Sequence, residues 1–373
     1  MKNISKFMVL PAILGTAVLI DGCGGSSSSK HKSSTVEISG RAMKGVLANA
    51  DCIVSNTGGI TLYSSVGEDN ACTGSNGRYS ITLSSTTESD LDLPVSVEIR
   101  ARSTETTYKC DLPAGCEGQS FGAAVPITDA TFSLKAFVPS LNRGTSSAVE
   151  TVSVTPWTNI AARRVETVAG TGTITADQIE KAYGEVAGVL NNVLGLDGTS
   201  SSFNTNFFEL DVADVTNPIT DDVNESDKQL GTLLSFASAS VIGLVNESTA
   251  NTSITAVIDN MANAFKNDGL FDVNPTAANI DDTALNIDLT SIVTNISNVV
   301  QNISINLDAA NQILLNQNLG GSDTNDALGA LETTTQAIVT QKESVTDANN
   351  DPTAPVAVPG SGGTPTGGTG TGN

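Results

Sequence analysis

The chain has 373 residues, enough for about two domains, and 39% of them are hydrophobic, which is sufficient for packed cores. Acidic residues outnumber basic ones by 40 to 18, and the net charge of −22 disfavours binding to nucleic acid or to anionic membrane surfaces. The only histidine is His31. Catalysis that pairs a nucleophile with a histidine base elsewhere in the chain is therefore excluded.

Residues 1–22 have the layout of an export signal that is removed from the mature chain. Lys2 and Lys6 form a short basic start, and an apolar run follows from Phe7 to Ile20. A membrane-spanning helix needs about 20 apolar residues, which is more than this run contains. We therefore interpret the run as a cleaved signal and not as a transmembrane anchor.

The apolar run ends in Ile20, Asp21, Gly22 and Cys23. Apart from Asp21, which departs from the usual small or uncharged residue, this succession resembles the lipobox of bacterial lipoproteins. The resemblance implies that Cys23 carries a lipid, and Gly24 after it implies sorting to the outer membrane. The alternative is plain secretion, with Cys23 in a disulfide.

Residues 23–35 are rich in glycine and serine and predict a flexible tether. With Cys23 lipidated, four cysteines remain, and in an oxidising compartment they allow two disulfides in three connectivities. These candidates are Cys52, Cys72, Cys110 and Cys116. The turn-forming sequence DLPAG favours pairing of the last two, which leaves the first two for each other. A metal site is the weaker alternative, because there is no C-x-x-C pair and His31 lies in the tether.

Short stretches of alternating hydrophobicity predict a β-sandwich domain over residues 36–140. The expected strands are 36–40, 52–55, 60–66, 78–83, 94–101 and 130–138. Val95, Val97 and Ile99 alternate with polar residues, so we expect them on one inward face. In the last strand, Phe137 falls on the face opposite to the other apolar residues.

Three stretches within this region occur in a fixed order: VEISG at 36–40, KGVLANADCIV at 44–54 and TGSNGRYSI at 73–81. The order resembles a transthyretin-like module of the carboxypeptidase regulatory-domain type. The resemblance implies a β-sandwich with a structural or binding role and no catalysis. Gly77 suits a turn position with positive φ, and Tyr79 is expected to face inward.

A helical period replaces the alternation after Pro156, and we expect an all-α bundle over residues 155–345. The expected helices are 156–168, 176–194, 227–246, 254–266, 289–317 and 325–342. Thr175 and Gln178 form a capping box before the second helix, and Gly269 ends the fourth. The fold class expected for the whole chain is therefore α+β by segments, with an N-terminal β-sandwich followed by a helical bundle.

The helix at 289–317 carries a heptad seam with a broad apolar face, which favours a bundle core, while an oligomerising coil is the alternative. Residues 351–373 consist mostly of Pro, Gly, Thr and Ser and predict a disordered tail. Trp157 could lie at the junction of the two domains, and it is expected to be a packed core residue, with a ligand platform as the alternative.

Three further stretches, TPWTNIAA at 155–162, LGL at 194–196 and FKNDGLFD at 265–272, complete a wider pattern. It resembles bacterial envelope lipoproteins that join a carboxypeptidase regulatory-like domain to a helical domain. The resemblance brings no catalytic motif with it.

Usable nucleotide-binding and serine-hydrolase patterns do not occur, so we expect neither an enzyme nor a cofactor. Calcium is the best cation candidate, because Asp347, Asn349 and Asp351 place oxygen ligands at alternate positions, but Pro352 stands where a calcium loop needs glycine. The acidic stretch 209–227 is more simply a solvated connection.

We expect a non-enzymatic envelope protein that is held to the membrane by the lipid on Cys23. It would act as a binding, scaffold or adhesion module for a protein or surface partner, and not for nucleic acid. The alternative is an accessory protein that binds hydrophobic compounds such as lipids or alkanes and helps their uptake, since a loosely packed bundle of Leu, Ile and Val could hold a long apolar molecule.

Overall fold

The computed structural model describes nine stretches of the chain, all within one compact unit. They are residues 34–85, 90–102, 104–112, 115–141, 147–194, 196, 202–216, 228–244 and 253–269. The predicted signal at 1–22, the cysteine predicted to carry a lipid, the helices predicted at 289–317 and 325–342 and the tail predicted at 351–373 lie outside these stretches.

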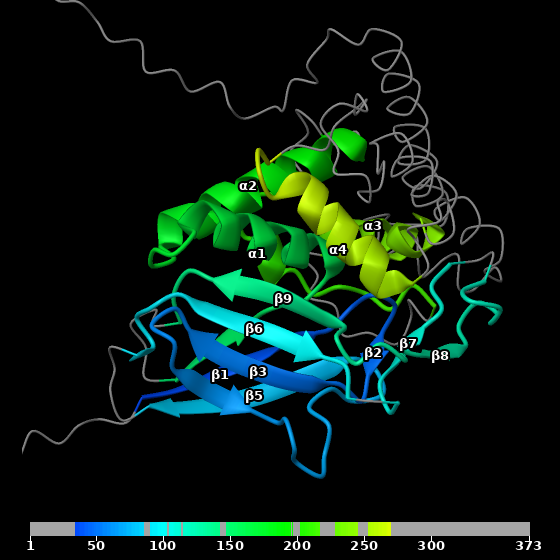
Figure 1. Ribbon diagram of the computed structural model, residues 1–373, viewed down its shortest axis with the longest axis horizontal. Coiled ribbons are helices and arrows are strands. Elements are labelled where there is room, and N and C mark those ends of the chain that lie inside the picture. The colour runs from blue at the N-terminus through cyan, green and yellow to red at the C-terminus, as the bar shows by residue number, and fades with distance from the viewer. Residues whose placement is uncertain are drawn as a thin grey trace, which may run out of the picture. The chain divides into compact units, whose positions relative to one another are not determined.

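The first half of the described chain forms strands in three sheets (Figure 1). The strands are β1 (Ser34–Arg41), β2 (Leu47–Ala48), β3 (Asp51–Asn56), β4 (Thr61–Ser64), β5 (Arg78–Ser85), β6 (Val95–Arg100), β7 (Thr107–Lys109), β8 (Ala124–Pro126), β9 (Ser133–Val138) and β10 (Ser147–Thr151). The sheets have the orders β10-β1-β5, β4-β3-β6-β9 and β2-β7-β8. Only β1 and β10 pair in parallel; the other pairs of named strands are antiparallel.

All six predicted strands are present, with shifted ends, and four short or late strands were not predicted. β1 begins at Ser34, inside the segment predicted as tether, and β4 is shorter than the predicted 60–66. The strands β2, β7 and β8 have only two or three residues, which is too short to show an alternation. β10 lies beyond residue 140, where the sandwich was predicted to end.

The predicted inward face of β6 is confirmed, because Val95, Val97 and Ile99 are buried and the residues between them are not. They pair in register with buried residues of β3 on one side and β9 on the other, among them Val54 and Leu134. The opposite face of β9 is covered as well, since Phe137 is buried. The four-stranded sheet therefore has apolar contacts on both faces at its β9 end.

Two predictions about β5 are confirmed: the turn at Gly77 before the strand, and the inward-facing Tyr79 near its start. Gly77 has a φ of 72°, a conformation that glycine adopts without strain. Tyr79 is buried, and its hydroxyl donates a hydrogen bond to the carbonyl oxygen of Val152 after β10. This bond ties β5 to the segment that leads into the first helix.

The second half of the described chain is helical, so the molecule is α+β by segments. The helices are α1 (Pro156–Ala169), α2 (Ala176–Val193), α3 (Lys228–Ser240) and α4 (Ile254–Phe265), with short 3-10 turns at Phe207–Glu209 and Val241–Leu244. The predicted helix at 227–246 is thus shorter, because its last residues form a 3-10 turn.

Several predicted helix ends are confirmed. Thr175 N–H donates to Gln178 Oε1 at 3.0 Å, and Gln178 N–H donates to Thr175 Oγ1 at 3.4 Å, so the capping box before α2 is present. After α4, Gly269 has a φ of 78° and donates its N–H to the Phe265 carbonyl at 2.9 Å, which ends the helix.

The helices pack on the end of the four-stranded sheet. α1 and α2 both contact β9, and α1 also contacts α2 and α4 (Figure 1). The Lys135 N–H on β9 donates to Asn159 Oδ1 of α1 at 3.1 Å, and the Phe137 N–H donates to the Tyr183 hydroxyl of α2 at 2.9 Å. Trp157, at the start of α1, is fully buried, as expected for a core residue.

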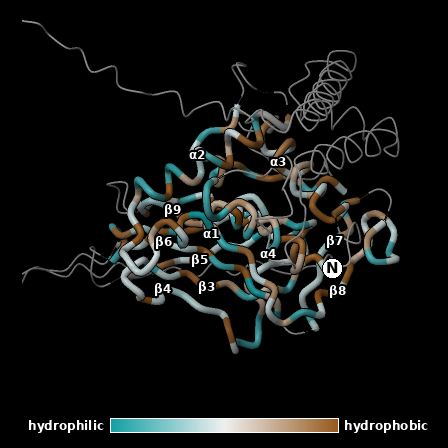
Figure 2. The backbone as a smooth tube through the Cα atoms, turned by 45° about the horizontal axis from the view of Figure 1, so that its top comes forward, coloured by the Kyte–Doolittle hydropathy of each residue, from teal (hydrophilic) through white to brown (hydrophobic). Residues whose placement is uncertain are grey.

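Strands and helices share one buried apolar cluster, which extends from Val36 on β1 to Phe265 on α4. Hydrophobic and hydrophilic stretches alternate along the chain trace (Figure 2), as expected for elements that bury one face. The division of the chain at 140 and 155 into separate domains stays a prediction.

Candidate functional site

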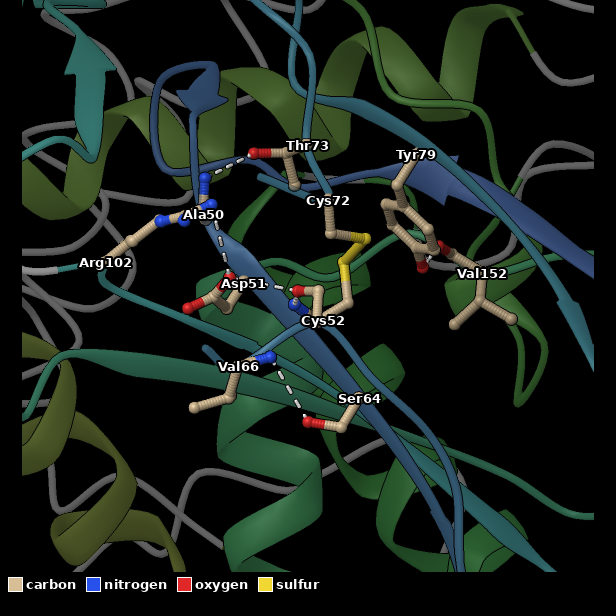
Figure 3. Close-up of a disulfide and its surroundings, with 11 residues drawn as sticks. Ala50, Asp51, Cys52, Ser64, Val66, Cys72, Thr73, Tyr79, Arg102 and Val152 are labelled. Atoms are coloured by element: carbon tan, nitrogen blue, oxygen red, sulfur yellow. Dashed lines mark hydrogen bonds and ion pairs between the residues drawn. A yellow bond between two sulfur atoms is a disulfide. The ribbon is translucent and has the colours of Figure 1, made fainter. Parts of the chain in front are cut away.

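The four cysteines predicted to form disulfides do so, in the pairing that the sequence favours. Cys52 on β3 bonds to Cys72, and Cys110 bonds to Cys116. The first bridge spans 20 residues and fixes the segment before β5 to the four-stranded sheet. Beside it, Ala50 N–H donates to Thr73 Oγ1 at 2.8 Å (Figure 3).

Polar side chains surround the first bridge on the β3 side. Cys52 N–H donates to Ser65 Oγ at 3.0 Å, and Ser65 Oγ donates to Asp51 Oδ1 at 3.0 Å. Arg102 places Nη1 3.9 Å from the same carboxylate oxygen (Figure 3). The hydrogen bonds through Ser65 join β3 to the end of β4 beside the disulfide and support the fold there.

The second bridge closes a six-residue separation and lies next to a buried ion pair. Lys44 Nζ lies 3.0 Å from Asp111 Oδ1, and both side chains are only 1% exposed. The ring of Tyr108 lies 5.5 Å from Lys44 Nζ, and its hydroxyl donates to Glu117 at 3.2 Å. Burial, followed by the charge of Glu117, raises the pKa of the Tyr108 phenol, so it stays protonated.

The acidic stretch 209–227 was predicted to be a solvated connection, but two of its carboxylates form ion pairs with residues of the β-sheets. Asp211 accepts from Arg78 of β5 at 3.0 Å, and Asp214 lies 2.6 Å from Lys109 of β7. Both carboxylates are largely shielded from solvent. The pairs attach the segment before α3 to two different sheets.

A polar cleft of about 420 Å³ lies between α1 and α4. Its lining residues are Arg163, Glu166, Thr167, Asp259, Asn263 and Lys266. Arg163 lies 3.5 Å from Glu166 and 3.7 Å from Asp259. Partial burial raises the pKa of the Asp259 carboxyl, and Arg163 opposes this shift. The cleft can accept polar or charged groups, whereas it offers little apolar surface for a lipid chain.

Arg164, next in sequence to Arg163, links its own helix α1 to α2 and to the end of α4. Its guanidinium donates to both carboxylate oxygens of Glu185 on α2, at 2.8 and 3.3 Å, and to the backbone carbonyls of Lys266 and Asn267 after α4. The side chain is only 8% exposed. It fixes the walls of the cleft and is not itself one of the lining residues.

Within the described stretches, no three His, Cys, Asp or Glu side chains gather closely enough to hold a metal ion. No helix of that part of the chain combines the length and apolar character needed to cross a bilayer. Cys23 and the calcium candidates Asp347, Asn349 and Asp351 lie outside the described residues.

Comparison with known proteins finds no matching family model, no matching curated protein and no matching solved structure. The sequence pointed to the four bridging cysteines, but not to the buried pair Lys44 and Asp111. The signal available for it was a lysine inside the otherwise apolar stretch AMKGVL, combined with an aspartate directly after Cys110.

Proposed function

We propose that this chain is an exported protein of the bacterial cell envelope, held to the outer membrane by a lipid on Cys23. The observation that carries the proposal is the pair of disulfides, Cys52–Cys72 and Cys110–Cys116. Structural disulfides are typical of oxidising compartments, and they use every cysteine except Cys23. That leaves the one unpaired cysteine at the end of the apolar signal, where a lipid would be attached.

We further propose that the strands form a transthyretin-like β-sandwich of the carboxypeptidase regulatory type. Its support is the positive φ of Gly77 and the burial of Tyr79, the two features that this resemblance implies for the TGSNGRYSI stretch. The segment beyond residue 270 would complete an all-α bundle. The sandwich is supported by the sequence resemblance together with these local features, and the bundle by the apolar heptad seam at 289–317.

The proposed activity is non-enzymatic binding, as a scaffold or adhesion module. Disulfides and interlocked ion pairs such as Arg78–Asp211 give a rigid body suited to presenting a surface. The polar cleft between α1 and α4 is the candidate contact site, because Arg163 and Lys266 stand beside Asp259 and Glu166. A partner that carries both charges on its surface fits this arrangement better than an apolar ligand does.

The anchor is tested by replacing Cys23 with serine in the full-length chain and separating membrane from soluble proteins. We expect the wild type in the membrane fraction and Cys23→Ser in the soluble fraction, because a serine cannot take the thioether-linked lipid. The matched control is the double variant Cys110→Ala/Cys116→Ala, which loses two buried cysteines and keeps the anchor. Membrane association of Cys23→Ser equal to that of the wild type would sink the proposal.

A carrier of hydrophobic compounds is the competing function, and native mass spectrometry of the gently purified protein separates it from a binding module. We expect an acylated chain without any further small molecule. A co-purified lipid or alkane-like ligand in stoichiometric amount would instead favour the carrier and contradict the scaffold function.

A further inference from the structure

A lysine and an aspartate meet in the interior, away from the polar cleft. Lys44 lies in the turn between β1 and β2, and Asp111 follows β7, 67 residues later. The Nζ atom and Oδ1 are 3.0 Å apart, and each side chain is 1% exposed. Water therefore has almost no access to either charged group.

Neighbouring groups hold the two side chains in one geometry. The Gly45 N–H donates to the second carboxylate oxygen of Asp111 at 2.6 Å, and the Tyr108 ring packs beside Lys44 Nζ. A Cβ at residue 45 would lie 1.9 Å from the Lys109 carbonyl oxygen, so only glycine allows the two segments this close approach. The Cys110–Cys116 bridge then constrains the loop that begins at Asp111.

An ion pair in such a place is expensive, because both charges have lost their hydration and a single ion-pair contact, one backbone N–H and one ring replace it. An amide in the same position would carry no charge, and desolvation of a hydrogen-bonded amide is far less costly than that of two ions. The 3.0 Å contact between Nζ and Oδ1 also holds the amine next to the carboxyl group with which it would react.

We propose that Lys44 and Asp111 become joined by an intramolecular amide bond. A proton passes from the ammonium to the carboxylate, and the neutral amine attacks the carboxyl carbon. Charge that develops on Oδ2 is stabilised by the Gly45 N–H. One C–N bond forms, the bond from carbon to Oδ1 breaks, and one water leaves with Oδ1 and two protons of the former ammonium. No oxidant or reductant takes part.

Burial, and not distance, singles out this pair. Lys109 and Asp214 are closer, at 2.6 Å, but the lysine side chain is 32% exposed. Lys135 and Glu166 lie at 2.7 Å, and their side chains are 25% and 31% exposed. Both pairs keep contact with water, so they remain ionic and serve as controls within the same chain.

A tryptic map of the full-length, reduced and alkylated protein tests the bond. An acylated Lys44 resists trypsin, so residues 42–78 stay together and are linked to residues 110–135. We expect this linked species at the summed mass of the two peptides less one water, about 18 Da. The two disulfides lie one within each peptide and cannot account for the link. Cleavage after Lys109 and Lys135 releases the second peptide and shows that the two control lysines are unmodified.

The opposite result is equally clear. Complete cleavage after Lys44, with residues 45–78 and 110–135 recovered as separate peptides, would overturn the proposal. Lys44→Arg should abolish the linked species because a guanidinium does not form the bond, while Lys109→Arg should preserve it. Persistence of the link in Lys44→Arg would also rule the assignment out, and the wild-type map decides the question even where that variant does not fold.

Discussion

At the residue scale, Tyr79 of the TGSNGRYSI stretch forms a hydrogen bond that joins two parts of the structure. Its phenol is fully buried, and burial raises its pKa, so the group stays protonated and can donate a hydrogen bond at physiological pH. It donates to the Val152 carbonyl and so joins β5 to the segment before α1. The tyrosine therefore holds the sheet to the helical part and is no acid–base group.

Tyr79→Phe removes this hydroxyl and leaves the Val152 carbonyl without that donor. We expect the free energy of unfolding to fall by about 1–3 kcal/mol, the cost of an unsatisfied buried acceptor. Chemical denaturation of the purified protein measures it. Tyr63→Phe, at a half-buried position on β4, is the control and should change stability by less than about 0.5 kcal/mol. Equal effects of the two variants would contradict the role assigned to Tyr79.

Residue-level prediction from sequence succeeded where local chemistry decides the structure. Gly77 and the pair Thr175 with Gln178 act within a few residues of themselves, so their turn and capping box could be predicted. Lys44 and Asp111 could not, since their contact depends on the fold bringing distant segments together.

At the element scale, the two disulfides differ in the length of chain they close. Cys52–Cys72 spans 20 residues and Cys110–Cys116 spans 6. A longer closed loop restricts the unfolded chain more, so the first bridge should contribute about 3 kcal/mol and the second about 2 kcal/mol.

The double variants Cys52→Ala/Cys72→Ala and Cys110→Ala/Cys116→Ala test this order under the same conditions. We expect the first to have the larger loss in free energy of unfolding, measured by urea denaturation. A larger loss from the second variant would mean that packing around the short loop outweighs the loop-closure effect.

Arg164 joins α1 to α2 and to the end of α4. Arg164→Met keeps much of the volume but removes the bonds to Glu185 and to the end of α4. Because the site is largely buried, we expect a loss of about 2–3 kcal/mol in the free energy of unfolding. Arg163→Met is the matched control one residue away; its side chain is 47% exposed, and its ion pairs should matter by less than about 1 kcal/mol. Similar losses in both variants would contradict the role of Arg164.

The elements that the sequence predicted are the ones long enough to show a period. α1 and α2 have 14 and 18 residues, and their apolar spacing marks them clearly. β2 and β7 have two and three residues; β2 pairs with β7, and β7 also pairs with β8. Such strands are a consequence of tertiary contacts and leave no local signal.

At the scale of the whole molecule, the sequence predicted strands followed by helices but not their contact. Phe137 seemed misplaced in an alternating strand, and it is buried because Tyr183 and the helices lie over that face of β9. One apolar residue on an expected polar face was therefore a trace of this packing in the sequence. The anchor and the bundle beyond residue 270 stay predictions from the sequence.

We propose above all that the mature protein begins at Cys23 and carries a lipid there. Intact mass spectrometry of the protein purified from the membrane fraction tests it most directly. We expect a mass that corresponds to residues 23–373 plus fatty-acyl groups, with fragmentation that places the added mass on Cys23. A chain that begins at another residue, or one that begins at Cys23 without acyl groups, would contradict the account.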